Sequence, residues 1–162
     1  MSRRDHFLCI VPESVLFASV LVVIGQIQGL FFGGLDSVTM FPWLPPGTNR
    51  TLVLLWAGIW EEAAFRVCLF GGMVWLLCCC KVSRDRALVA SLVVSSAVFS
   101  LCHHIGPQGY PFEFHPFLFR FEAGMLFGVL FATRGYPTAA LTHSFYDLLV
   151  GCLLPLLPQA TV

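Results

Sequence analysis

Three short stretches of the chain place side chains capable of acid, base or hydrogen-bond chemistry within strongly apolar surroundings. They are Glu61-Glu62-x-x-x-Arg66, Phe99-x-x-x-His103 and His143-x-x-x-Asp147. An ionisable residue inside a membrane-spanning segment costs roughly 2.5 to 3.5 kcal/mol on insertion scales, so it usually has a partner or serves a polar site. These stretches are therefore the candidates for function.

The first stretch separates two adjacent carboxylates. Glu62 and Arg66 are four residues apart, the helical spacing at which a carboxylate and a guanidinium can pair. Glu61 points about 100° away on the same helix. The sequence therefore predicts an ion pair between Glu62 and Arg66 and leaves Glu61 available for another task.

The second and third stretches use the same helical spacing. Phe99 and His103 share one helix face, and so do His143 and Asp147. A single intramembrane histidine is as often a packing residue as a functional one. Three polar groups on three different helices favour a common site.

Composition indicates a membrane protein. Apolar residues make up 57% of the 162 residues, charged residues 11%, and the mean hydropathy is +0.82. About a quarter of the residues of a soluble domain are charged. The formal net charge is zero and the basic residues are scattered, so no nucleic-acid partner is expected.

Five apolar segments are each close to the ~20 residues that cross a bilayer. They cover approximately residues 8–33, 51–80, 87–107, 114–133 and 136–157. We therefore expect an all-α fold, a polytopic membrane helix bundle of about five transmembrane helices. No repeat or linker divides the chain, so residues 1–162 are expected to form a single integral membrane domain. The seven cysteines lie in or beside apolar runs, and we expect them to be small buried side chains.

The positive-inside rule gives an orientation. If the amino terminus lies in the cytoplasm, the basic residues that lie outside the spans fall on the cytoplasmic side of the membrane. The exception is Arg50, which falls on the outer side. The cytoplasmic residues are Arg3, Arg4, Lys81, Arg84, Arg86 and Arg134. The carboxyl terminus is then expected outside.

The three motifs together resemble those of the CAAX prenyl protease and bacteriocin-processing family, also called the Abi family of glutamic intramembrane proteases. That family carries Glu-Glu-x-x-x-Arg, Phe-x-x-x-His and His-x-x-x-Asn or Asp in this order. The resemblance covers approximately residues 51–150, the expected catalytic core, and includes the run Arg134-Gly135-Tyr136-Pro137 before the last motif.

The resemblance implies hydrolysis of a peptide bond by water, activated by Glu61 and His103, without a covalent intermediate or cofactor. Glu62 and Arg66 would orient the site, and the third motif would stabilise the oxyanion. An ionised Asp147 only accepts hydrogen bonds. It must therefore either be protonated to donate one or instead hold one tautomer of His143.

In the expected orientation the site opens toward the outside, which suits an exported or membrane-associated protein substrate. Some small relatives act on carboxyl-terminal sorting signals of exported proteins, and the resemblance implies that substrate class here. It also implies a bacterial inner (plasma) membrane location in contact with lipid. A bundle of only five spans leaves room for completion by a homo-oligomer.

The residues are also compatible with three other hypotheses of function. Glu61, His103, His104 and His143 include plausible zinc ligands, which would make a zinc-dependent membrane metalloprotease, although no His-Glu-x-x-His is present. His103 and His143 could instead ligate haem. The third reading is a non-catalytic immunity or scaffold protein of the same fold.

Overall fold

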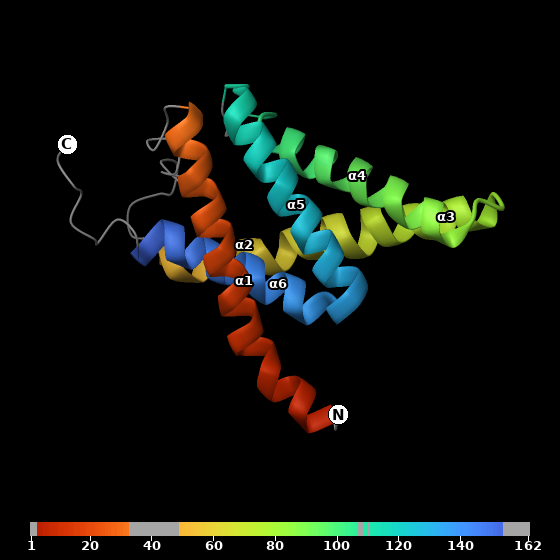
Figure 1. Ribbon diagram of the computed structural model, residues 1–162, viewed down its shortest axis with the longest axis horizontal. Coiled ribbons are helices and arrows are strands. Elements are labelled where there is room, and N and C mark those ends of the chain that lie inside the picture. Colours follow the sequence, from red (N-terminus) through yellow and green to blue (C-terminus); the bar gives the residue numbers. More distant parts are fainter. Residues whose placement is uncertain (1–2, 33–48, 107–108, 110, 154–162) are drawn as a thin grey trace. The chain divides into compact units, whose positions relative to one another are not determined.

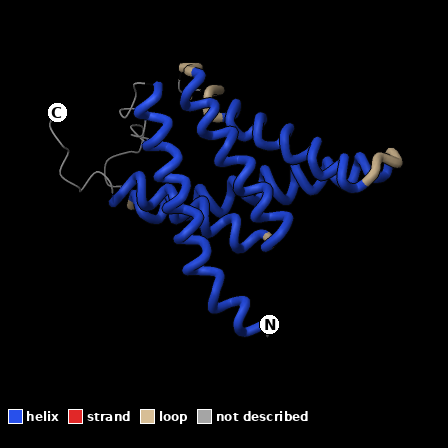
Figure 2. The backbone as a smooth tube through the Cα atoms, viewed as in Figure 1, coloured by secondary structure: helices blue, strands red, loops and turns tan. Residues whose placement is uncertain are grey.

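Helices make up the regular structure of the described residues. The computed structural model describes residues 3–32, 49–106, 109 and 111–153. Within those ranges Figures 1 and 2 show helices and connecting loops, with no strand. The all-α fold class is confirmed.

The helices follow one another along the chain with short connections. They are α1 (Arg3–Phe32), α2 (Arg50–Glu62), the π-helix η2 (Ala63–Gly71), α3 (Gly72–Cys79), α4 (Arg84–Cys102), α5 (Phe114–Arg134), α6 (Tyr136–Leu148) and the π-helix η3 (Leu149–Leu153).

Four helical stretches in the described ranges are long and apolar enough to cross a membrane. They are Cys9–Phe32, Arg50–Cys79, Arg84–Cys102 and Phe114–Arg134, and they correspond to the first four predicted segments. The predicted fifth segment, residues 136–157, is helical from Tyr136 to Leu153 and is not among the four. Residues 154–157 lie outside the described part.

The second span is one continuous helix of three parts. Its start is capped by Asn49, whose side-chain oxygen accepts a hydrogen bond from the backbone N–H of Leu52 at 3.3 Å. From Ala63 to Gly71 the backbone is a π-helix, a rare conformation that often accompanies functional sites. The wider π turns therefore begin immediately after the paired glutamates.

The described helices group into two compact units, Trp60–Ala140 and Met1–Ile59 with Leu141–Val162. In the first, α4 packs against α5, η2 and α3, and α5 also contacts η2. Small side chains on α4 are fully buried; they are Ser91, Ser95, Ser96 and Ser100. A Cβ on Gly124 would lie 3.1 Å from the Cβ of Ser96, so α5 approaches α4 closely.

The turn between α5 and α6 is made by a glycine. Gly135 has φ of +92°, where a side chain would be strained, and its N–H reaches the carbonyls of Leu130 and Phe131 at 3.1 Å each. This ends α5, and α6 begins at the next residue.

The other unit contains α1, the first part of α2, and the end of α6 with η3. Leu21 of α1 and Leu54 of α2 are buried in it, and α1 contacts η3. The hydroxyl of Ser144 donates a hydrogen bond to the carbonyl of Leu55 at 3.0 Å, which ties α6 to α2.

Large apolar side chains cover the outside of the helices. Trp56, Trp75 and Phe31 are each more than 60% exposed. Such a surface suits surrounding acyl chains, because the side chains are apolar and the backbone polar groups inside a helix bond to one another.

The expectation of buried cysteines is wrong. Six of the seven thiols are exposed, and Cys152 is half-buried. The close helix contacts are occupied by glycine and serine, such as Gly124 and Ser96, which allow nearer backbone approach than a thiol does. The cysteines therefore occupy the outward faces.

Candidate active site

Glu62 and Arg66 form the ion pair that their spacing predicts. Nε of Arg66 lies 3.0 Å from Oε2 of Glu62, and both side chains have no exposed surface. A buried charge is costly unless it is paired, so each residue neutralises the other. The pair spans the change from α2 to the π-helix η2.

Phe99 of α4 lies at the centre of a group of rings that surrounds this pair. The guanidinium carbon of Arg66 is 5.1 Å from the Phe99 ring centre and 6.0 Å from that of Phe127. Phe65 meets Phe99 edge to face at 5.2 Å. Cation–π and edge-to-face contacts therefore connect η2, α4 and α5 around one aromatic side chain.

His103 is the residue immediately after α4, and two contacts with Phe99 fix its ring. Nδ1 of His103 lies 2.8 Å from the Phe99 carbonyl oxygen, and the two rings are 4.9 Å apart. A carbonyl oxygen only accepts, so Nδ1–H donates this hydrogen bond. In the neutral imidazole Nε2 then carries a lone pair.

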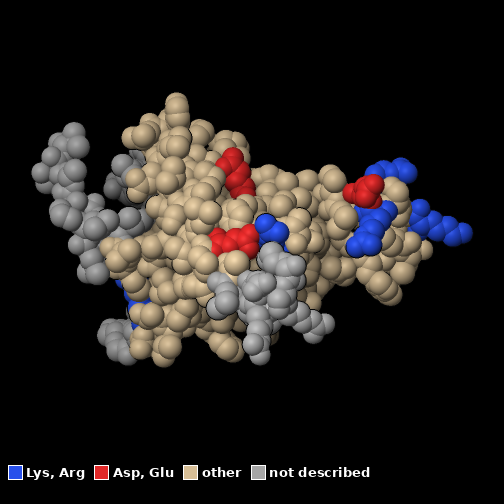
Figure 3. Space-filling model, turned by 60° about the horizontal axis from the view of Figure 1, so that its bottom comes forward, with Lys and Arg blue, Asp and Glu red and all other residues tan. Residues whose placement is uncertain are grey.

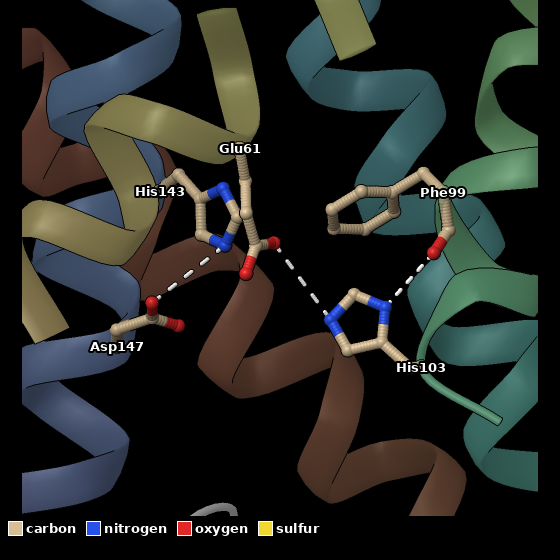
Figure 4. Close-up of polar contacts among 5 residues, drawn as sticks. All are labelled: Glu61, Phe99, His103, His143 and Asp147. Carbon is tan, nitrogen blue, oxygen red and sulfur yellow. Dashed lines mark hydrogen bonds and ion pairs between the residues drawn. The ribbon is translucent and has the colours of Figure 1, made fainter. Parts of the chain in front are cut away.

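Nε2 of His103 faces Glu61, as Figure 4 shows. It lies 3.8 Å from Oε2 of Glu61, and these side chains are 27% and 31% exposed. The distance is too long for a direct hydrogen bond, and Oε2 itself is buried although the Glu61 side chain is partly exposed. Glu61 therefore differs from its fully buried neighbour Glu62 in both partner and accessibility.

His143 and Asp147 form a second pair on α6. Nε2 of His143 lies 3.6 Å from Oδ2 of Asp147, and both side chains are buried. The shared helix face expected for this motif is therefore present within its own unit. Figure 4 draws both pairs with dashed lines. The Glu61–His103 pair belongs to one unit and the His143–Asp147 pair to the other.

No group of three or more His, Cys, Asp or Glu side chains within the described ranges lies close enough to hold a metal ion. The zinc hypothesis draws its ligands from both units, Glu61, His103 and His104 in one and His143 in the other, and stays open.

Sequence reasoning missed the aromatic partners of Phe99. Phe65 lies inside the first motif, and Phe127 lies between Gly124 and Gly128 on α5. The four-residue spacing of these two glycines is a helix-packing pattern, and a Cβ on Gly124 would meet the Phe99 ring at 3.3 Å. That signal points to the side of α5 on which Phe127 packs.

The comparison with protein families defines the class of protein. The family model described as Type II CAAX prenyl endopeptidase Rce1-like matches residues 43–149, well over half of the chain. This range includes all three motifs. The comparisons with curated proteins and with solved structures returned no match.

The chain belongs to this Rce1-like family of CAAX prenyl endopeptidases. It is accordingly a membrane-embedded member of a protease family, as the motifs predict, and its four long apolar helices agree with an integral membrane protein. The roles of the individual site residues stay predictions.

Proposed function

We propose that this protein is an intramembrane endopeptidase in which Glu61 and His103 activate a water molecule. One observation carries the proposal. Nε2 of His103 and Oε2 of Glu61 face each other at 3.8 Å, and both side chains are partly exposed although this oxygen is buried. A general base must lie within hydrogen-bond reach of the proton that it removes, or reach it through one water. A water placed between Glu61 and His103 would lie within reach of both side chains.

The two acceptors would orient the water for attack. A water lying between them donates one hydrogen to Nε2 of His103 and the other to Glu61, which leaves an oxygen lone pair directed away from both. That lone pair attacks the carbonyl carbon of the scissile bond. Glu61 accepts the proton, the C–N bond of the tetrahedral intermediate breaks, and the proton passes to the departing nitrogen.

The buried groups around Phe99 would keep His103 in the reactive tautomer. Arg66, neutralised by Glu62, packs against the Phe99 ring, and the Phe99 carbonyl accepts the hydrogen bond of Nδ1. Such support is what a preorganised site needs, because misplacement by about 1 Å can cost about 100-fold in rate.

We assign oxyanion stabilisation to His143 and Asp147. The support is their position in the third family motif and their mutual distance of 3.6 Å. A hydrogen-bond donor directed at the developing negative charge is usually worth about 100-fold or more in rate.

The basic residues favour a site close to the outer membrane face. Charged side chains gather at the turn between α3 and α4 (Figure 3), where Lys81, Arg84 and Arg86 are exposed. The positive-inside rule assigns this turn to the cytoplasm. The 19 residues of α4 then span ~28 Å to its other end, beside His103.

The substrate that fits this arrangement is the carboxyl-terminal segment of a membrane-attached protein. The family description names CAAX prenyl endopeptidases, which suggests a prenylated tail. The outward site favours the sorting segment of an exported protein in a bacterial inner membrane. Labelling of a carboxyl-terminal cysteine tag only from the cytoplasmic side would contradict the outward orientation.

Cleavage by the purified protein tests the proposal. The wild-type protein in liposomes is offered two internally quenched peptides, a farnesylated CAAX peptide and a carboxyl-terminal sorting segment, and mass spectrometry identifies the products. We expect cleavage of at least one peptide and retention of activity after dialysis against a chelator. Loss of activity that zinc restores would favour the metalloprotease, and failure to cleave either peptide would favour a non-catalytic protein.

A further inference from the structure

The helices α2 and α6 make a very close contact at Gly58 and Ser144, both of which are buried. A Cβ placed on Gly58 would lie 2.5 Å from Oγ, 2.6 Å from the backbone N and 2.9 Å from Cα of Ser144. Two of these three atoms belong to the backbone, so a side-chain rotation cannot make room. Only glycine fits at this position while α6 stays in place.

Ser144 adds a hydrogen bond to the same contact. Its hydroxyl donates to the carbonyl oxygen of Leu55 at 3.0 Å, and its side chain has no exposed surface. Hydrogen bonds from hydroxyl groups and close backbone approach both hold membrane helices together. Both occur here at one residue.

The contact continues in antiparallel order along α2 and from α6 into η3. A Cβ on Gly151 would meet Cδ1 of Leu54 at 2.7 Å, and Oγ1 of Thr51 lies 4.0 Å from Sγ of Cys152. The Leu54 atom is the end of a flexible side chain and can move. Gly58 differs because the obstruction is the α6 backbone itself.

Ser144 lies in the chain between the two residues of the third motif. It follows His143 directly and precedes Asp147 by three residues, so a displacement of its backbone moves both. We propose that Gly58 and Ser144 are positioning residues, which hold the His143–Asp147 pair in register with α2 for the hydrolysis. This inference rests on the function proposed above.

Alanine substitutions at three glycines test the role of Gly58. We expect Gly58→Ala to lower kcat by about 100-fold, the effect of a shift of about 1 Å, with little change in KM. Gly72→Ala is the matched control, because a Cβ there has no atom within 4 Å. Gly151→Ala tests the other end of the contact, and we expect both controls to keep the wild-type kcat.

Ser144→Ala provides a second test that adds no bulk. It removes the hydrogen bond to Leu55 and leaves the close approach intact. We expect kcat to fall by up to about tenfold, as for one neutral hydrogen bond.

A cross-link separates positioning from assembly of the helix pair. In a Thr51→Cys background we expect a disulfide with Cys152, found by peptide mapping, because the two side chains are adjacent. The disulfide should form equally in the wild type, Gly58→Ala and Ser144→Ala. The assays use whichever of the two quenched peptides the wild-type protein cleaves.

The inference is overturned if Gly58→Ala or Ser144→Ala keeps the wild-type kcat. It is also overturned if both variants lose the disulfide in proportion to kcat, which indicates a structural role only. Glu61→Gln is measured in parallel. An active Glu61→Gln protein rejects the proposed function, whereas an inactive one beside an active Gly58→Ala protein rejects only the positioning role.

Discussion

Nδ1 of His103 lies 2.8 Å from the carbonyl oxygen of Phe99, one helical turn earlier. This hydrogen bond determines which imidazole nitrogen carries the proton, and it leaves Nε2 directed at Glu61, 3.8 Å away. The Phe-x-x-x-His motif therefore has a physical explanation. The ring of Phe99 supports the buried Arg66, and its carbonyl orients the histidine.

His103→Ala is predicted to remove catalysis without unfolding the protein. The side chain is 27% exposed and follows the end of α4, so little packing is lost. A general acid or base contributes about 10²–10⁴-fold, and we expect kcat to fall by that factor with an almost unchanged thermal midpoint. Wild-type activity in this variant would exclude His103 from the reaction.

Phe99→Leu is predicted to reduce both stability and activity. The backbone carbonyl remains, and the ring that contacts Arg66, Phe65 and His103 is lost. A Phe→Ala change in a core costs about 3–5 kcal/mol, and we expect Phe99→Leu to cost less than that. We also expect a lower kcat, because His103 loses its ring contact.

Phe70→Leu is the matched control for that change. Phe70 is also buried and meets Phe131 edge to face at 5.7 Å, outside the Phe99 group. It should lose comparable stability in a denaturation experiment and keep its kcat. An equal fall of kcat in the two variants would show that general destabilisation accounts for both.

Arg66→Met is predicted to destabilise the protein by about 3–5 kcal/mol, because Glu62 is then a buried charge without its ion-pair partner. The double variant Glu62→Gln/Arg66→Met removes both charges and should recover most of the lost stability. Unfolding in mixed micelles measures both variants. A double variant no more stable than Arg66→Met would show that the ion pair is not the source of the effect.

Asp147→Asn is predicted to keep or raise activity. The family motif accepts Asn or Asp at this position, and an amide can donate a hydrogen bond without needing protonation. Asp147→Ala should lose activity, because it removes the polar group. Complete loss of kcat in Asp147→Asn would instead assign Asp147 to holding the tautomer of His143.

The sequence was sufficient to predict contacts made along a single helix. The pairs Glu62–Arg66 and His143–Asp147 and the shared face of Phe99 and His103 follow from the four-residue spacing. The helical fold and the first four spans follow from apolar segments of bilayer length.

Contacts made between helices were beyond sequence reasoning. The position of Phe127 beside Arg66 depends on how α5 packs on α4, and the spacing of Gly124 and Gly128 indicates a helix contact without identifying that ring. The π-helix η2 was also missed, since its residues, apolar on both sides of Arg66, do not distinguish a π-helix from an α-helix. The orientation in the membrane and the single-domain organisation stay predictions.

Substitution of Glu61 tests the central claim most directly. Glu61→Gln keeps the size of the side chain and removes the base, whereas Glu122→Gln makes the same change on α5 at a position outside the three motifs. Both proteins are purified, reconstituted into liposomes and assayed with the quenched peptide that the wild type cleaves. We predict that Glu61→Gln loses at least about 100-fold in kcat with an unchanged thermal midpoint, while Glu122→Gln remains active. Cleavage by Glu61→Gln at the wild-type rate would contradict the mechanism.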